Sequence, residues 1–134
     1  MNSPDVVVID YGMGNILSVC QGFEHCGASV KVTSNHDEIL SASRVVLPGV
    51  GAFSGGMKEL CKLGLDSIIK KISAKGVPLL GICLGMQMLL DESEEFNKTA
   101  GLGLIPGSVI PVPSVTIENK TQKIPHIGWN KLVL

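Results

Sequence analysis

One seven-residue segment near the middle of the chain, Gly81-Ile82-Cys83-Leu84-Gly85-Met86-Gln87, restricts the possible folds more than any other. Short apolar runs precede and follow it, so the sequence predicts a buried strand that ends at Ile82 and a helix that begins at Leu84. Cys83 then lies on a strand-to-helix turn with a glycine two positions away on either side. This is the nucleophile-elbow pattern with sulfur in place of the serine oxygen. Glycines are needed there because the turn is sharp and its backbone is crowded.

The position of Cys83 makes it a candidate catalytic nucleophile. The positive end of the following helix favours thiolate over thiol, so we expect the Cys83 thiol to have a lower pKa than Cys20, Cys26 and Cys61. The free N–H of Leu84 points to where an oxyanion would form. The alternative is a buried structural cysteine, but the two glycines and the flanking strand and helix favour the nucleophile.

A glycine-rich loop, Pro48-Gly49-Val50-Gly51-Ala52-Phe53, supplies a second set of candidate donors. It follows a predicted strand, so it lies at the same carboxyl edge of a parallel sheet as the elbow. We expect backbone N–H groups near Val50 or Gly51 to form an oxyanion hole together with Leu84. A plain turn is the simpler alternative, and a phosphate-binding P-loop is excluded because no Gly-Lys-Ser/Thr follows.

The hydrophobic pattern predicts an α/β fold. Continuous apolar runs predict buried parallel strands, and apolar residues spaced three and four apart predict amphipathic helices between them. The expected strands cover 6–9, 29–32, 45–47 and a run that ends at 82, and the expected helices include Ile16 to Phe23, Met57 to Cys61 and Leu65 to Ile72. This alternation predicts a mostly parallel sheet with helices on both faces, in one domain over 1–134.

The composition of the sequence changes after Glu95, where glycines and prolines interrupt short apolar runs. We expect antiparallel, hairpin-like strands at 108–112 and 131–134. The acidic run 91–95 is interpreted as a solvated helix end.

Composition excludes several classes of function. The net charge of −1 argues against nucleic acid or an anionic membrane as the main partner. No stretch is long enough for a membrane span, and the N-terminus lacks the features of a signal peptide. The four cysteines form no C-x-x-C pair, so we expect no metal site and no disulfide framework, and a reduced, cytoplasmic location.

Two further features leave the chemistry open. Gly12-Met13-Gly14-Asn15 lacks the third glycine of a dinucleotide-binding motif, because Leu17 stands at that position, and the second strand ends without the expected acid. Asn15 is more simply a helix cap. The proton shuttle that a thiolate needs is not evident. His25 fits the polar face of a helix, His36 fits a loop or cap position, and His126 follows Pro125 without the context of a catalytic base.

Four segments together resemble the triad-type, class I glutamine amidotransferases. They are 10–15, 47–53, 81–87 and 125–130, in the family's order. The first and last are similar in particular to the subgroup that forms the glutaminase subunit of imidazole glycerol phosphate synthase, in histidine biosynthesis. The resemblance implies a flavodoxin-like, doubly wound fold and no cofactor. It also implies that Cys83 attacks the side-chain amide of glutamine to form a thioester, and that ammonia passes to a (β/α)₈-barrel synthase subunit.

The resemblance also implies roles for other residues. Gly49, Gly51 and Gln87 match positions that hold the substrate glutamine, and Asn15 and Trp129 match positions that face the synthase partner. The family continues beyond this point to a His-Pro-Glu-type segment with the catalytic histidine and acid. We therefore expect a fragment or C-terminally truncated product, with part of the family domain missing.

Three alternatives stay open. In the first, the chain is a catalytically dead, truncated paralogue that only binds a synthase partner. In the second, it is an amidotransferase that serves another acceptor, such as a sugar in surface polysaccharide synthesis. A related cysteine hydrolase or redox-sensing thiol protein is the third, and the 85–87 and 125–130 segments argue against it.

Overall fold

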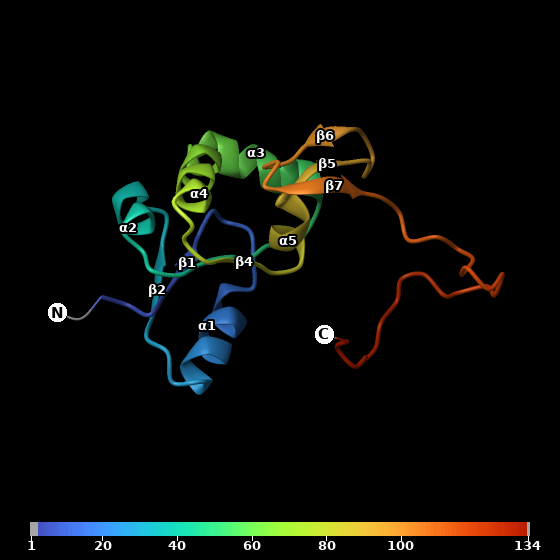
Figure 1. Cartoon of the computed structure of the whole chain (residues 1–134), viewed down its shortest axis with the longest axis horizontal. Coiled ribbons are helices and arrows are strands. Elements are labelled where there is room, and N and C mark those ends of the chain that lie inside the picture. Colours follow the sequence, from blue (N-terminus) through green and yellow to red (C-terminus); the bar gives the residue numbers. More distant parts are fainter. Residues whose placement is uncertain (1–2, 134) are drawn as a thin grey trace.

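A four-stranded parallel sheet forms the centre of the computed structural model, which describes residues 3–133 (Figure 1). Its strands are β1 (Val6–Ile9), β2 (Val30–Thr33), β3 (Val45–Leu47) and β4 (Leu79–Gly81), in the order β2-β1-β3-β4. This order is that of a flavodoxin-like, doubly wound sheet, so the predicted fold class is confirmed. β1 and β3 have the predicted bounds. β2 is shifted by one residue, and β4 ends at Gly81 because the chain turns into the elbow there.

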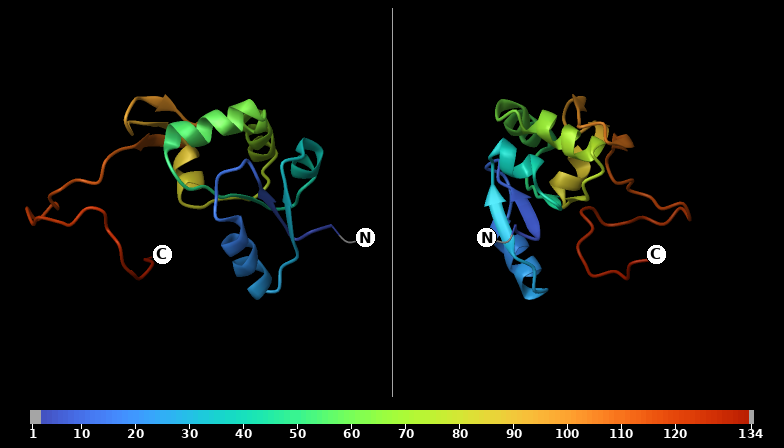
Figure 2. Two further views of the ribbon diagram at one scale, coloured as in Figure 1. Left: turned by 180° about the vertical axis from the view of Figure 1, so that it is seen from behind. Right: turned by 60° about the vertical axis from the view of Figure 1, so that its left-hand side comes forward.

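Helices cover both faces of this sheet. Figures 1 and 2 show α1 (Ile16–His25) on one side and α3 (Phe53–Lys62) and α4 (Leu65–Ala74) on the other. Side chains alternate along the strands as the pleat requires. Val7, Ile9, Val45 and Leu47 join the large core with α3, α4 and α5 (Leu84–Met88), whereas Val6, Val8 and Val46 pack with α1.

The α1 face is covered less completely than the opposite face. Leu80 and Val32 are the register partners of Val46 and Val8, so their side chains belong to this face. Both are large apolar side chains that remain exposed, and none of the α1 residues is fully buried. The larger core therefore lies under α3, α4 and α5.

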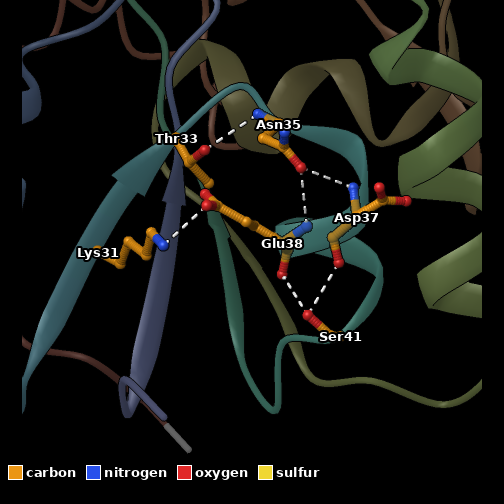
Figure 3. Close-up of polar contacts among 6 residues, drawn as sticks. All are labelled: Lys31, Thr33, Asn35, Asp37, Glu38 and Ser41. Carbon is orange, nitrogen blue, oxygen red and sulfur yellow. Dashed lines mark hydrogen bonds and ion pairs between the residues drawn. The ribbon is translucent and has the colours of Figure 1, made fainter. Parts of the chain in front are cut away.

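A short helix after β2 was not predicted. Residues His36–Leu40 form α2, so the assignment of His36 to a loop or cap position was wrong. The side-chain oxygen of Asn35 accepts hydrogen bonds from the N–H groups of Asp37 and Glu38 at 3.0 and 3.1 Å (Figure 3). This N-cap satisfies the first turn, and Ile39 anchors the helix in the large core.

Surface contacts join α2 to β2. Lys31 on β2 pairs with the Glu38 carboxylate of α2 at 2.8 Å (Figure 3). Within α2 itself, the Ser41 hydroxyl donates to the Asp37 carbonyl at the end of the helix. Hydrogen bonds from Lys31 and Thr33 lower the pKa of Glu38. The ion pair is exposed, so it contributes little to stability.

A second, three-stranded sheet follows α5. It contains β5 (Leu90–Ser93), β6 (Thr99–Ala100) and β7 (Ile105–Val109), in the order β6-β5-β7. The interpretation of 91–95 as a helix end was wrong, because its polar groups are paired as part of a strand and turn. Glu92 pairs with Lys98 at 3.0 Å, Ser93 is fully buried, and Glu95 accepts a hydrogen bond from the Phe53 N–H at 2.7 Å.

The strands expected near the C-terminus were also wrong. β7 covers Ile105–Val109 instead of 108–112, and it pairs in parallel with β5. Residues 131–133 form no strand, and Leu134 lies outside the described residues. After β7 the chain runs away from the two sheets (Figure 1), with one isolated bridge between Val115 and Thr121. No helix within residues 3–133 is long and apolar enough to cross a membrane.

Candidate active site

Three loops meet at the carboxyl edge of the parallel sheet. They follow β1 (10–15), β3 (48–52) and β4 (82–83). The strand order reverses between β1 and β3, which is where open α/β sheets bind ligands. The Tyr11 hydroxyl donates a hydrogen bond to the Pro48 carbonyl at 2.8 Å, and Gly49 packs against Leu84 and Gly85. The loops predicted to share this edge are therefore in direct contact.

Cys83 has the backbone conformation of a nucleophile elbow. Its φ of 54° and ψ of −117° are unfavourable for a residue with a side chain, and its side chain is exposed. The flanking glycines are required by close packing. A Cβ on Gly81 would lie 2.6 Å from the Met86 Cα, and one on Gly85 would lie 1.8 Å from the Leu47 carbonyl oxygen. The predicted strand, turn and helix around Cys83 are thus present.

Unpaired N–H groups surround this elbow. Within residues 3–133, no hydrogen bond uses the N–H of Gly49, Val50, Gly51 or Leu84 as donor. Gly51 has a φ of +98°, which favours glycine and lets the chain turn sharply before α3. A Cβ on Gly49 would meet the Leu84 Cβ at 3.0 Å, so the two groups of donors lie near each other. The arrangement has the components of an oxyanion hole, and the roles of Val50, Gly51 and Leu84 stay predictions.

An apolar cavity of about 500 Å³ opens beside Cys83. One wall is formed by the cap residue Asn15 and by Val19 and Phe23 of α1, and the other is formed by 48–50 and 82–83. Gln87 lies one helical turn after Cys83 on α5, is half-buried, and is not part of the lining. Its predicted contact with glutamine stays a prediction.

Comparison with known proteins agrees with this geometry. The family model "Glutamine amidotransferase class-I" matches residues 7–134. The chain belongs to the class I glutamine amidotransferases. The predicted family is therefore confirmed.

Curated relatives of this amidotransferase are subunits of one synthase. "Imidazole glycerol phosphate synthase subunit HisH 1" of Legionella pneumophila (strain Lens) is 54% identical over 128 residues, which cover 96% of this chain and 60% of the relative. The HisH subunit of Listeria monocytogenes serotype 4a is 47% identical over 127 residues, covering 95% and 59%. The chain thus spans about 60% of the length of these relatives.

A solved structure shares the fold. "Crystal structure of glutamine amidotransferase" superposes with a TM-score of 0.65 at 18% identity, covering 76% of this chain and 54% of that chain. At this identity the likeness supports the fold alone.

The two predicted interface residues lie on different parts of the amidotransferase. Asn15 is the N-cap of α1, as expected locally, because its side-chain oxygen accepts from the Ser18 N–H at 3.3 Å. Trp129 lies on the segment after β7, and its side chain is fully exposed. Their contact with a partner stays a prediction.

None of the three histidines lines the cavity beside Cys83. His25 is exposed at the end of α1, as expected. The His36 ring is hydrogen-bonded to the Leu63 carbonyl at 2.8 Å, and the His126 ring contacts the Asn130 amide at 2.7 Å. The described residues therefore bring the candidate nucleophile and the candidate oxyanion donors together, with no histidine in the lining of the cavity. Within the same residues, no group of His, Cys, Asp and Glu side chains could hold a metal ion.

Sequence reasoning did not single out Tyr11. It is the only tyrosine in the chain, its side chain is buried, and its hydroxyl contacts the loop after β3. Burial, and then the negative charge of the Cys83 thiolate, raises the pKa of Tyr11 to about 12. The one available signal was a lone aromatic residue two positions after a buried strand.

We expect Tyr11 to make the folded chain sensitive to alkaline pH. Its pKa in the folded state is higher than its ordinary value of 10.0, so its contribution to stability is complete below pH 10 and is lost as the pH rises toward 12. The slope is at most about 1.4 kcal/mol per pH unit. Denaturant unfolding of wild type and Tyr11→Phe at pH 8 to 11.5 measures it. A stability difference between the two proteins that stays constant with pH would contradict this prediction.

We also expect Cys83 to be alkylated before Cys20 and Cys61. Burial raises the pKa of both of those thiols, with a further contribution from Glu24 at Cys20 and from Asp66 at Cys61. A smaller thiolate fraction slows alkylation. Limited iodoacetamide near pH 7, followed by peptide mass mapping, ranks the four cysteines. Faster labelling of another cysteine in folded protein would count against the elbow.

Proposed function

We propose that this chain carries the nucleophile of a glutaminase. The Cys83 thiolate attacks the side-chain amide carbon of glutamine and a tetrahedral oxyanion forms. The C–N bond then breaks, the nitrogen takes a proton from water and leaves as ammonia, and a γ-glutamyl thioester remains on sulfur. One observation carries this proposal: Cys83 has the strained elbow conformation beside N–H groups that no acceptor within residues 3–133 uses. Membership of the class I amidotransferases supports the same chemistry.

The neighbouring residues have distinct roles in this proposal. The N–H of Leu84 and an N–H at Val50 or Gly51 bind the oxyanion, and each such donor contributes about 10²–10³ in rate. Gly49 and Gly51 leave room for the substrate backbone near the loop, and Gln87 on α5 holds glutamine. No cofactor is needed for this amide chemistry.

We further propose that the ammonia serves imidazole glycerol phosphate synthase in histidine biosynthesis, in the cytoplasm. The support is that the relatives at 54% and 47% identity are HisH subunits of that enzyme. The partner would be the (β/α)₈-barrel synthase subunit, with Asn15 and Trp129 in the interface. An amidotransferase serving a different acceptor has no specific observation in its favour.

We expect Trp129→Ala to weaken binding to the synthase subunit by roughly 30-fold, because exposed tryptophans in interfaces commonly contribute about 2 kcal/mol or more. The melting temperature should stay within about 2 °C, since the Trp129 side chain is fully exposed. Isothermal titration of the purified partner measures the affinity. Ile117→Ala is a matched control, because Ile117 is an equally exposed apolar side chain of the same segment. If both variants bind like wild type, Trp129 is outside the interface.

A second candidate function is binding without catalysis. It is favoured by one observation, that no histidine lines the cavity beside Cys83. Such a chain would dock on the synthase subunit and occupy the place of an active glutaminase. Both candidates predict binding, and they differ in the chemistry of Cys83.

A glutamine-shaped electrophile tests the leading proposal. A diazoketone analogue of glutamine should label Cys83, and millimolar glutamine should slow the labelling. Asparagine, which is one methylene shorter, should protect much less, and Cys83→Ala should prevent labelling. Equal protection by both amino acids, or none, would show that Cys83 has no glutamine site and would favour the docking function.

A further inference from the structure

The loop that carries the candidate oxyanion donors is held by a single hydrogen bond. Within residues 3–133, the bond from the Tyr11 hydroxyl to the Pro48 carbonyl is the only hydrogen bond made by residues 48–51. Tyr11 is 2% exposed, so water does not compete for this donor. The remaining contacts of the loop are non-directional. A Cβ on Gly14 would be 3.4 Å from the Pro48 ring, and one on Gly51 would be 3.4 Å from the Met13 methyl.

The bond fixes the direction of a peptide plane. The peptide between Pro48 and Gly49 is trans, so its C=O and N–H point in opposite directions. Since the carbonyl is held toward the Tyr11 hydroxyl, the Gly49 N–H is turned away from it. The hydroxyl also lies beside the first turn of α5, because a Cβ on Gly49 would meet both the Tyr11 oxygen, at 2.5 Å, and the Gly85 nitrogen, at 3.0 Å. Tyr11 thus sits between the loop and the elbow.

We propose that Tyr11 is a positioning residue for this reaction: by binding the Pro48 carbonyl, its hydroxyl fixes loop 48–51 in the orientation that presents N–H groups to the oxyanion on Cys83. This inference rests on the proposed glutaminase chemistry. Without the bond, the Pro48–Gly49 peptide plane can rotate, and the N–H groups that follow it along the loop have to be reoriented before each attack. The phenol stays protonated throughout the neutral range, since burial raises its pKa to about 12. It is therefore a permanent donor at the pH of the reaction.

The test separates acylation from simple thiol reactivity. γ-Glutamyl p-nitroanilide has a good leaving group, so the first turnover reports attack by Cys83 through an oxyanion, as a burst of p-nitroaniline. Iodoacetamide alkylates the same sulfur by displacement, without an oxyanion. We expect Tyr11→Phe to slow the burst by about 10- to 100-fold, somewhat less than the loss of a whole donor. Alkylation of Cys83, and the substrate concentration that gives a half-maximal burst rate, should each change by less than about threefold.

A second protein keeps the test independent of folding. Because Tyr11 is the only tyrosine, fluorotyrosine can be incorporated at this one site with almost no change in shape. Its phenol is more acidic, and a phenolate cannot donate to the Pro48 carbonyl. The burst rate should therefore fall as the fluorinated phenol ionises, as followed by its absorbance, and the wild-type rate should not fall over that pH range. If Tyr11→Phe does not fold, this protein decides the question.

Each outcome bears on the proposal. A burst in Tyr11→Phe as fast as in wild type would overturn it. An equal fall in the burst and in iodoacetamide alkylation would also overturn it, because Tyr11 would then support the elbow and not the loop. If wild type gives no burst while Cys83 is still alkylated, the glutaminase chemistry itself fails, and the role of Tyr11 fails with it. A slow burst with unchanged alkylation supports both.

Discussion

Replacing Gly85 with alanine should prevent the chain from folding normally. A Cβ at this position would lie 1.8 Å from the carbonyl oxygen of Leu47 and 2.7 Å from its carbonyl carbon, so backbone and not a flexible side chain would have to move. Either β3 or the first turn of α5 must shift, and both contribute to the large core. We expect a loss of at least about 4 kcal/mol in the free energy of unfolding, or no folded protein. Denaturant unfolding followed by circular dichroism measures it.

A matched control is available on α1. Gly22 is also a helical glycine, but a Cβ there would have no atom within 4 Å. We expect Gly22→Ala to be neutral or to stabilise the chain by up to about 1 kcal/mol, because alanine favours helix. A Gly85→Ala protein with the unfolding midpoint of wild type would show that the tight elbow described here is incorrect.

The second large effect concerns turnover. We expect residues 1–134 to release ammonia from glutamine at a rate at least about 10³-fold below that of a full-length relative, even with the synthase subunit present. Among the described residues no histidine lines the cavity beside Cys83, so no imidazole there is placed to protonate the leaving nitrogen or to activate water for hydrolysis of the thioester. Sulfur is intrinsically nucleophilic, so slow acylation can persist while hydrolysis stalls. A coupled assay for ammonia, with Legionella HisH 1 and its partner run in parallel, measures the ratio.

Steady ammonia release at the rate of the full-length relative, abolished by Cys83→Ala, would contradict this expectation. It would mean that His25, His36 or His126 acts as the base. His126 is the first candidate, because His25 is at the far end of α1 and the His36 ring is already bonded to the Leu63 carbonyl.

The elements that carry the chemistry were the most predictable from sequence. The apolar runs of β1 and β3 are short and rich in β-branched valine and isoleucine, which favours buried strands, and their bounds were predicted correctly. The elbow at Cys83 was predictable because this turn leaves no room for a Cβ at the positions two before and two after the cysteine, so glycine is required at both. The glycine-rich loop after β3 could be placed at the same edge from the direction of parallel strands alone.

Other parts depend on contacts that sequence does not display. α2 has one buried residue, Ile39, so it lacks a hydrophobic period. The acidic run 91–95 looks like a solvated surface until Lys98 and the Phe53 N–H are placed beside it. The bond from Tyr11 to Pro48 joins two loops 37 positions apart, and no local pattern indicates it.

Acylation of Cys83 by glutamine-type substrates is tested most directly by trapping the adduct. The chain should be mixed with γ-glutamyl p-nitroanilide, quenched in acid within the first turnover and digested for peptide mass mapping. We predict one γ-glutamyl group on the peptide that contains Cys83, removable by hydroxylamine and absent from Cys83→Ala. Unmodified Cys83 in folded protein, or a glutamyl group on Cys20, Cys26 or Cys61 instead, would contradict the assignment of Cys83 as the nucleophile.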